Sequence, residues 1–224
     1  MQSFKNVKNL FRVYSKMDDL HSALDNGHLV FYRKTFTTIV ALMEARDAYT
    51  SFHSERVSEM AKRFCKIQKI PPTQFLLVEM AAEVHDIGKI GIQDSILNKP
   101  GKLSPDEFKE IQKHPQIGAD ALLKIDGNLK NVANIVLAHH ERWDGCGYPQ
   151  KLKGDEIPIA SRIIAICDSV DAMLSKRVYR PAMDEKVCQS EILKGRGKQY
   201  QPELADAFLS NWETIVCDIY NKNE

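Results

Sequence analysis

Apolar residues along this chain recur every three or four positions, which predicts helices, and no segment alternates convincingly in the way that predicts a strand. The first helical segment, residues 4–24, ends at Asn26-Gly27, a pair typical of a helix stop. Its apolar positions are Val7, Leu10, Val13, Met17, Leu20 and Leu24. Five of them fit a heptad seam, but about two heptads are too few to establish a coiled coil. Three interpretations of residues 1–30 therefore stay open: a helix packed on its own domain, a linker, or a helix that forms a homodimer.

Most of the remaining chain has the same helical period. Helices are predicted at residues 29–48, 54–70, 75–84, 129–140, 158–174, 184–193 and 202–219. Another begins at Ser104, breaks and restarts at His114-Pro115, and helical structure continues to Leu123. The segment 75–84 is apolar almost all round, so we expect it at the centre of the fold with Thr73 as its N-cap. The residues from Ser104 to Glu107 have the features of a capping box, with proline at the first helical position. Residues 91–103 and 141–158 are predicted loops, and the predicted fold class is all-α.

Length and composition narrow the function classes. The chain has 224 residues, enough for one domain of generous size or one domain with an appendage. Its 31 basic and 30 acidic residues give a net charge of +1, which argues against a partner such as a DNA or RNA polymer. Five widely spaced cysteines without a CxxC pair favour reduced thiols. The sequence has no membrane-spanning apolar run or signal-peptide core, so we expect a cytoplasmic protein without membrane insertion in this chain; a fragment of a longer membrane-bound sensor would look the same.

Two apolar helical segments end in adjacent side chains of the kind that bind metals. His85-Asp86 follows one of them, and His139-His140 follows another. A buried imidazole or carboxylate must be hydrogen-bonded or metal-bound, because desolvating either group alone costs several kcal/mol. Neighbouring side chains on a helix point about 100° apart, so two adjacent groups cannot both be core residues. At a helix end, both can nonetheless reach a metal that lies beyond the end.

Three further candidates are His53, His114 and Asp168. A lone histidine on an apolar face is more often a satisfied core residue than a ligand, but five in such contexts are harder to dismiss. Asp168 follows an apolar run and needs a cation, a buried arginine or a helix terminus as its partner. The imidazole and carboxylate set suits Fe, Mn, Co, Ni or Zn and exceeds what one ion needs. Two ions sharing a carboxylate, with Asp86 the best candidate, are a standard device for phosphoester hydrolysis by a bridging hydroxide.

At these residues the chain resembles the HD-GYP domain, the cyclic-di-GMP phosphodiesterase branch of the HD superfamily. The matching stretches are Arg46-Asp47-Ala48-Tyr49-Thr50 through His53-Ser54-Glu55-Arg56-Val57; His85-Asp86-Ile87-Gly88-Lys89-Ile90-Gly91; Leu97-Asn98-Lys99-Pro100-Gly101-Lys102-Leu103; His114-Pro115 with Gly118; His139-His140-Glu141-Arg142-Trp143-Asp144-Gly145 with Gly147-Tyr148-Pro149; and Asp168 through Arg177, with Tyr179, Arg180 and Pro181. The resemblance covers roughly residues 40–210. It implies an HD-type helical bundle with a long ordered GYP loop. We therefore divide the chain into an N-terminal helix, 1–30, and an HD-GYP catalytic domain, 31–224.

The resemblance also implies roles for individual residues. One metal would be held by His53, His85, Asp86 and Asp168, and the second by Asp86, His114, His139 and His140. Asp86 and Lys89 would be the catalytic residues, with Lys89 contacting the scissile phosphate and offsetting its charge in the transition state. A lysine after a helix end is otherwise most often simply solvated. Tyr148 would lie in the substrate groove, whereas Gly-Tyr-Pro alone is merely a turn.

Two arginines, Arg177 and Arg180, resemble the phosphate-binding pair of the family. Guanidinium groups suit phosphate oxygens, and the alternative is a surface salt bridge to Asp184 or Glu185. Some family members carry a carboxylate one helical turn before the first histidine, and it recruits a third metal. That position is Tyr49 here, so we predict two divalent ions, with iron or manganese favoured over zinc, nickel or cobalt.

The resemblance implies a metal-dependent hydrolase that opens cyclic di-GMP by attack of a bridging hydroxide, giving linear pGpG, with onward cleavage to GMP left open. One alternative is a cyclic-dinucleotide receptor or adaptor with little turnover. Another is the same chemistry on a different cyclic dinucleotide, such as cyclic GMP-AMP.

Overall fold

A computed structural model describes residues 26–46, 52–175 and 181–220. Their helices are α3 (Asn26–Arg46), α4 (His53–Ile67), α5 (Pro72–Val84), α6 (Asp94–Leu97), α7 (Pro105–Ile111), α8 (His114–Ile125), α9 (Lys130–Leu137), α10 (Ile159–Leu174), α11 (Glu185–Gly195), α12 (Pro202–Ser210) and α13 (Trp212–Val216). Short 3-10 turns occur at Ile87–Gly91, Gly127–Leu129 and Gly154–Glu156. Within these residues there is no strand, only one isolated bridge, so the predicted all-α class is confirmed. No helix in these described ranges is long and apolar enough to cross a membrane.

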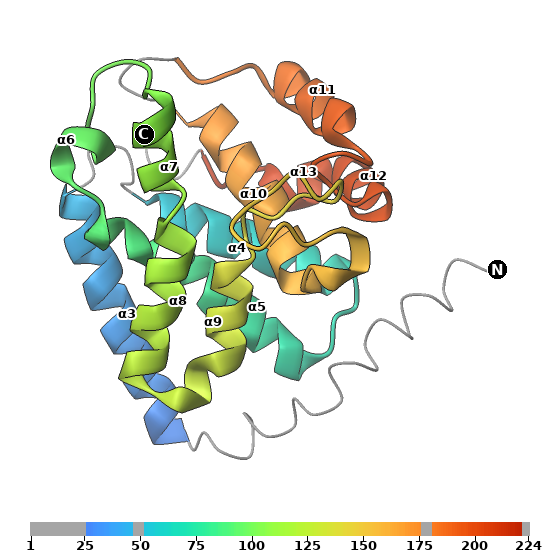
Figure 1. Cartoon of the computed structure of the whole chain (residues 1–224). Coiled ribbons are helices and arrows are strands. Elements are labelled where there is room, and N and C mark those ends of the chain that lie inside the picture. Colours follow the sequence, from blue (N-terminus) through green and yellow to red (C-terminus); the bar gives the residue numbers. More distant parts are fainter. Residues whose placement is uncertain (1–25, 47–51, 176–180, 221–224) are drawn as a thin grey trace.

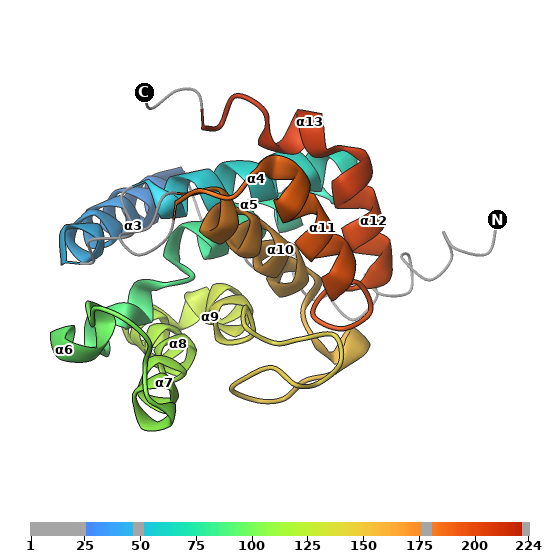
Figure 2. The ribbon, with the colours of Figure 1, turned by 90° about the horizontal axis from the view of Figure 1, so that it is seen from above.

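Helix α5 lies at the centre of the fold, as its apolar sequence predicts. It packs against α4 on one side and α9 on the other, and α10 packs against α4 (Figure 1). Seen from above, α3, α4, α5 and α10 form one layer, and α7, α8 and α9 form a second (Figure 2). The buried side chains of α5 include Leu77, Val78, Met80, Ala81 and Val84. Because α5 joins the two layers, its C-terminal end places His85 and Asp86 between them.

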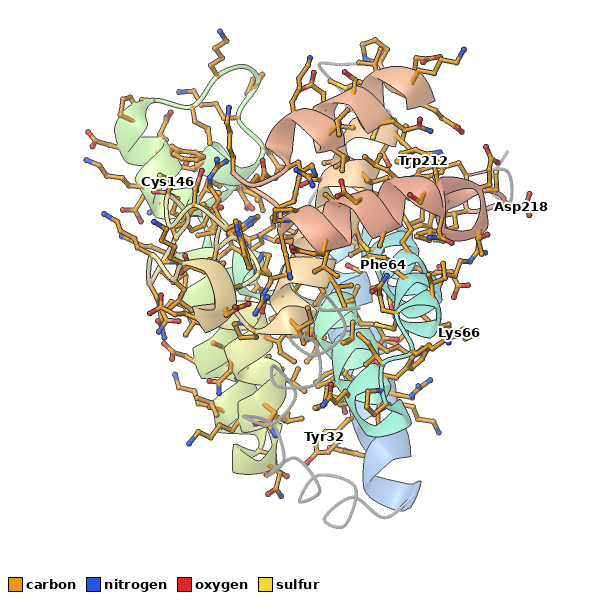
Figure 3. All side chains as sticks on the ribbon, turned by 90° about the vertical axis from the view of Figure 1, so that its right-hand side faces the viewer. Tyr32, Phe64, Lys66, Cys146, Trp212 and Asp218 are labelled. Atoms are coloured by element: carbon orange, nitrogen blue, oxygen red, sulfur yellow. The ribbon has the colours of Figure 1, made fainter. Side chains whose placement is uncertain are left out.

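The C-terminal helices close the core against α4. The ring of Phe64 on α4 meets that of Phe208 on α12 edge-on, with 5.1 Å between centroids, and Phe208 in turn meets Trp212 at the start of α13. Phe64 and Phe208 are fully buried, and each large aromatic side chain buried in this way stabilises the fold by about 2–3 kcal/mol. Figure 3 shows Phe64 and Trp212 in the same part of the molecule, with Tyr32 at its opposite end.

The local signals around α5 and α7 have mixed outcomes. The capping box at Ser104 is confirmed, because its hydroxyl accepts from the Glu107 amide and the Glu107 carboxylate accepts from the Ser104 amide. The prediction of Thr73 as N-cap is wrong: the cap position is Pro71, and Pro72 starts α5 because its fixed φ suits the first helical turn. The predicted loop 91–103 contains α6, whose single turn is too short for an apolar period to show.

Two predicted boundaries also change. Asn26-Gly27 does not stop a helix, since α3 begins at Asn26 and runs through Gly27, so the division at residue 30 falls inside α3. Residues 1–25 lie outside the described part of the chain, and the role of the N-terminal helix stays a prediction. The single helix predicted at 202–219 is two helices, α12 and α13. They break at Asn211, whose side-chain amide donates to the Ala207 carbonyl and takes the place of the helical hydrogen bond there.

Candidate metal centre

Three predicted ligands lie at helix ends and are held there by backbone carbonyls. His85 follows α5, His114 starts α8 directly after α7, and His139 follows α9. In each case Nδ1 lies 2.5–2.7 Å from the carbonyl oxygen of the residue three positions earlier. The last carbonyls of a helix have no intrahelical partner, so they are available as acceptors. Nδ1 must therefore donate, which leaves the Nε2 lone pair free to bind a metal.

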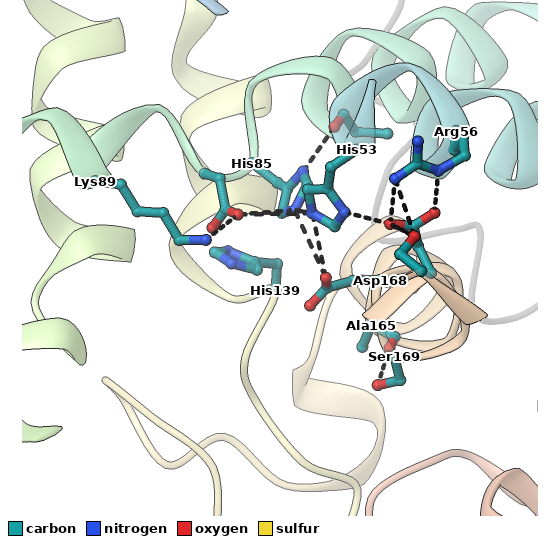
Figure 4. A network of polar contacts seen from close by, with 12 residues as sticks. His53, Arg56, His85, Lys89, His139, Ala165, Asp168 and Ser169 are labelled. Carbon is teal, nitrogen blue, oxygen red and sulfur yellow. Dashed lines mark hydrogen bonds and ion pairs between the residues drawn. The ribbon is translucent and has the colours of Figure 1, made fainter. Parts of the chain in front are cut away.

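His53 is held differently because it is the first residue of α4. Its Nδ1 lies 2.7 Å from Oδ2 of Asp171, a carboxylate of α10. Its Nε2 lies 3.2 Å from Nε2 of His85 and 3.4 Å from Oδ1 of Asp168. Figure 4 shows His53 between His85 and Arg56, with Asp168 just beneath it.

Asp86 lies at the centre of the histidine cluster. One carboxylate oxygen is 3.3 Å from Nε2 of His114, and the other is 3.6 Å and 3.7 Å from Nε2 of His85 and His53. Two groups of potential ligands share it: Asp86 with His114, His139 and His140, and Asp86 with His53 and His85. Within each group the ligand atoms lie within 4.8 Å of one another. Six of the seven predicted ligands thus form two sets that share one carboxylate. The seventh, Asp168, lies beside His53 and His85. Their role as ligands stays a prediction.

Burial keeps most of the imidazoles neutral. It lowers the pKa of His85 and His139 below the ordinary value, and burial together with the charge of His114 lowers the pKa of His140 to about 3. For His53, burial alone would lower the pKa. The hydrogen bond to Asp171 and the nearby carboxylate charges outweigh the effect of burial, so the pKa of His53 is raised overall. Neutral imidazole is the form that binds metals.

The Asp86 carboxylate is charged. Burial would raise the pKa of Asp86, but the ammonium group of Lys89, 2.6 Å from Oδ2, holds it well below its usual range together with the histidines. Five imidazoles, two carboxylates and no thiolate therefore face one another in a mostly buried space. This donor set fits two divalent ions of the Fe, Mn, Co, Ni or Zn kind.

Close backbone packing places the turn that carries Lys89. A Cβ atom on Gly88 would lie 1.9 Å from the carbonyl oxygen of His114, so only glycine allows the turn to approach α8 this closely. From the other side, the guanidinium of Arg46 donates to the carbonyls of Ile90 and Ile92, each at 2.5 Å. The turn is thus fixed between α3 and α8.

The loop 141–158 lies beside the cluster and is held by its own polar groups. Asp144 pairs with Arg142 at 2.7 Å and accepts from the Cys146 amide, and both contacts order the loop. Buried Glu141 accepts from the Gln150 amide at 2.6 Å. The Tyr148 ring lies 4.8 Å from the ring of His140, centroid to centroid, and its peptide bond to Pro149 is cis.

A cleft of about 300 Å³ opens between this loop, α7 and α10. Its lining includes the predicted ligands His139, His140 and Asp168, together with Tyr148, Phe108, Gln112, Ser169 and Gln199. The cleft therefore gives small molecules access to the cluster. Arg177 and Arg180, the predicted phosphate-binding pair, and Tyr49 lie outside the described residues.

A larger cavity, about 650 Å³, lies between α3, α4 and the C-terminal segment. Its described lining carries mixed charge, with Glu44, Glu79 and Glu83 near Lys62 and Arg63, and contains none of the predicted ligands. The smaller cleft is thus the one associated with the cluster.

One residue of the site was not singled out from the sequence. Asp171 is buried three positions after Asp168 on α10, and it holds His53 rather than facing the cluster. Its pKa is held well below the usual range by His53 and Arg56 against the opposing effect of burial. A second carboxylate one helical turn after the first, on an otherwise apolar helix, is the signal that points to it.

Comparison with known proteins places the chain in a family. The HD domain family model matches residues 38–204. A cyclic di-GMP phosphodiesterase of Vibrio cholerae is 35% identical over 93% of this chain and 45% of its own length. A 3'3'-cGAMP-specific phosphodiesterase 2 of the same organism is 37% identical over 78% of this chain and 34% of its own length. The chain therefore spans less than half the length of either relative.

A solved structure shares the fold. An HDG"Y"P protein from Bdellovibrio bacteriovorus superposes with a TM-score of 0.62 and 17% identity, covering 93% of this chain and 68% of that one. At this identity the likeness concerns the fold alone, while the sequence relatives carry the family assignment. The chain belongs to the HD domain family, the superfamily that the resemblance to the HD-GYP domain implies.

Proposed function

We propose that this chain is a metal-dependent phosphodiesterase that hydrolyses cyclic di-GMP to linear pGpG, with GMP as a further product to be tested. The observation that carries the proposal is the convergence of five histidines on one shared carboxylate, Asp86, with Asp168 beside His53, next to an open cleft. The relative named as a cyclic di-GMP phosphodiesterase supports the substrate class. A receptor without turnover would need no such ligand set.

Two divalent ions would be held by the two halves of the cluster. His53, His85, Asp86 and Asp168 would hold one, and Asp86, His114, His139 and His140 the other. When bound, the ions would supply Lewis-acid stabilisation of the phosphate and a water acidic enough to ionise near neutral pH. We favour iron or manganese over zinc, nickel or cobalt, and two ions rather than three because position 49 is tyrosine.

Lys89 and Tyr148 would act on the substrate itself. The Lys89 ammonium, fixed beside Asp86, would stabilise negative charge on the phosphate as the transition state forms. Tyr148, whose ring lies against His140 at the cleft, would orient the substrate by stacking or hydrogen bonding. Arg177 and Arg180 would bind its phosphates.

A second candidate substrate is 3'3'-cGAMP, because a relative of similar identity is named as specific for it. The chemistry at the phosphate would be the same, and only contacts to the bases would differ. Outside the site, we propose a cytoplasmic enzyme; whether residues 1–30 form a linker, a packing helix or a homodimer contact is tested by the oligomeric state of the chain with and without them.

The test is hydrolysis of both substrates by one anaerobically purified sample. Cyclic di-GMP and 3'3'-cGAMP would be compared by kcat/KM, with the products separated chromatographically. A pGpG product and a higher kcat/KM for cyclic di-GMP support the proposal. A higher kcat/KM for 3'3'-cGAMP favours the second candidate, and binding of either without product contradicts the enzymatic function.

A further inference from the structure

The histidines of the cluster are oriented by two different kinds of acceptor. His85, His114 and His139 each donate from Nδ1 to a carbonyl within three residues of their own position. These acceptors belong to the adjoining helix end, so they are present whenever that helix forms. His53 opens α4, where the helix presents amide donors rather than free carbonyls, and its acceptor comes from Asp171, 118 residues away.

Asp171 is itself held by side chains from three elements. It is 1% exposed, and Arg56 of α4 contacts both of its oxygens, at 2.6 Å and 3.1 Å. Ser175 donates to it at 3.1 Å. The hydroxyl of Tyr220, beyond α13, donates to Oδ1 at 2.9 Å, and the Tyr220 ring lies 5.7 Å from the Arg56 guanidinium carbon. Together these contacts hold the carboxylate in the orientation in which Oδ2 faces Nδ1 of His53.

We propose that Asp171 is a positioning residue that aims His53 Nε2 at one of the two metal positions, and that Arg56 and Tyr220 fix Asp171 for this purpose. The metal position that includes His53 then depends on the C-terminal end of the chain through the path Tyr220, Asp171, His53. The position formed by His114, His139 and His140 has no such dependence on Asp171 among the described contacts, because His114 and His139 are oriented by local carbonyls. This inference rests on the two-metal site of the proposed function.

The test is a Mn²⁺ titration of the full chain under anaerobic conditions. A chromophoric chelator would compete for the metal and give two dissociation constants, and electron paramagnetic resonance would distinguish single from spin-coupled Mn²⁺ pairs. For Asp171→Asn, we expect one dissociation constant to rise about 10- to 100-fold, the usual effect of losing the partner of a ligating histidine. The other should stay within about twofold, and the coupled-pair signal should be absent at concentrations that fill both positions of the wild-type chain.

Tyr220→Phe should weaken Mn²⁺ binding at the same position by roughly 2- to 10-fold, less than Asp171→Asn does, since it removes only one hydrogen bond to Asp171. The matched control is Tyr32→Phe, which removes a buried tyrosine hydroxyl from Asp126, beyond the end of α8 opposite to His114. It should change neither constant. Far-ultraviolet circular dichroism of the metal-free variants would establish that they are folded.

A folded Asp171→Asn chain that binds two Mn²⁺ ions with wild-type constants overturns the inference, as does equal weakening of both positions. If Asp171→Asn does not fold, Tyr220→Phe decides: selective weakening of one position supports the inference, and unchanged binding at both overturns it. Wild-type chain that binds two Mn²⁺ ions but hydrolyses no cyclic dinucleotide contradicts the proposed function and leaves this inference in place.

Discussion

The metal cluster and the cleft that opens onto it are built in different ways. Most of the cluster is made by helix ends, with His53, His85, His114 and His139 all buried, and Asp168 is added from within α10. The cleft is lined mostly from loops, with half-exposed Phe108 from α7 and three residues of α10. The buried cluster residues are thus fixed by the same packing that forms the core, whereas an exposed cleft residue such as Phe108 takes no part in that packing. This difference separates the chemistry, which belongs to the cluster, from substrate selection, which belongs to the cleft.

The largest effect is expected from removing the carboxylate shared by both halves of the cluster. Asp86→Ala should abolish both metal loading and cyclic di-GMP turnover, because each group of potential ligands includes Asp86. Metal content per chain and product formation would be measured on the same sample. A variant that retains two metals and normal turnover would contradict the assignment of the cluster.

Lys89→Ala should separate metal binding from catalysis. Loss of one preorganised charge that stabilises a transition state typically costs about 100- to 1000-fold in kcat. The metals should remain bound, because Lys89 is not among the ligands and its removal takes a positive charge away from Asp86. Metal analysis and steady-state kinetics check this, and a loss of kcat that merely tracks a loss of metal would argue against a role at the phosphate.

Phe108→Ala tests the cleft alone. Phe108 is 48% exposed and lines the cleft from α7, a position from which an aromatic ring can stack on a base of the substrate. Loss of base stacking worth ~1–3 kcal/mol would raise KM by roughly 5- to 100-fold with little change in kcat or metal content. Phe31→Ala, an exposed phenylalanine on α3, serves as the control. Unchanged KM in both variants would remove Phe108 from substrate binding.

The smallest expected effect concerns the stability of the metal-free protein against pH. Burial lowers the pKa of His140 to about 3, so its contribution to stability is complete above about pH 6.5 and is lost as the pH falls. His85 and His139 shift in the same direction, while the raised pKa of His53 acts oppositely. Urea unfolding of chelator-treated protein at pH 7.5 and 5.5 should show lower stability at pH 5.5. His140→Gln should reduce that difference, and an identical pH dependence in variant and wild type would be inconsistent with the shift.

The helical fold could be predicted because it depends on local pattern, whereas the gathering of the cluster followed from the number and kinds of its residues and from the resemblance to the HD-GYP domain. Apolar runs that end in His85-Asp86 and His139-His140 predict helix ends, and helix ends are where these groups are held. The assignment of the seven side chains as ligands and of Lys89, Tyr148, Arg177 and Arg180 as substrate contacts stays a prediction.

Other features could not be predicted because they depend on distant or very short interactions. The partner of His53 lies 118 residues away, and nothing near His53 in the sequence identifies it. The single turn of α6 is held at its start by Arg46, 48 residues from Asp94, rather than by an apolar face of its own. The break at Asn211 interrupts an apolar period that continues on both sides of it, because a side-chain hydrogen bond competes with the helix.

The most direct measurement of the central claim is turnover of cyclic di-GMP by metal-free protein as Mn²⁺ is added in known equivalents. A binuclear site predicts little activity up to about one equivalent and a plateau near two, with bound metal counted on the same samples. Full activity with one bound ion per chain, or with none, would contradict the account.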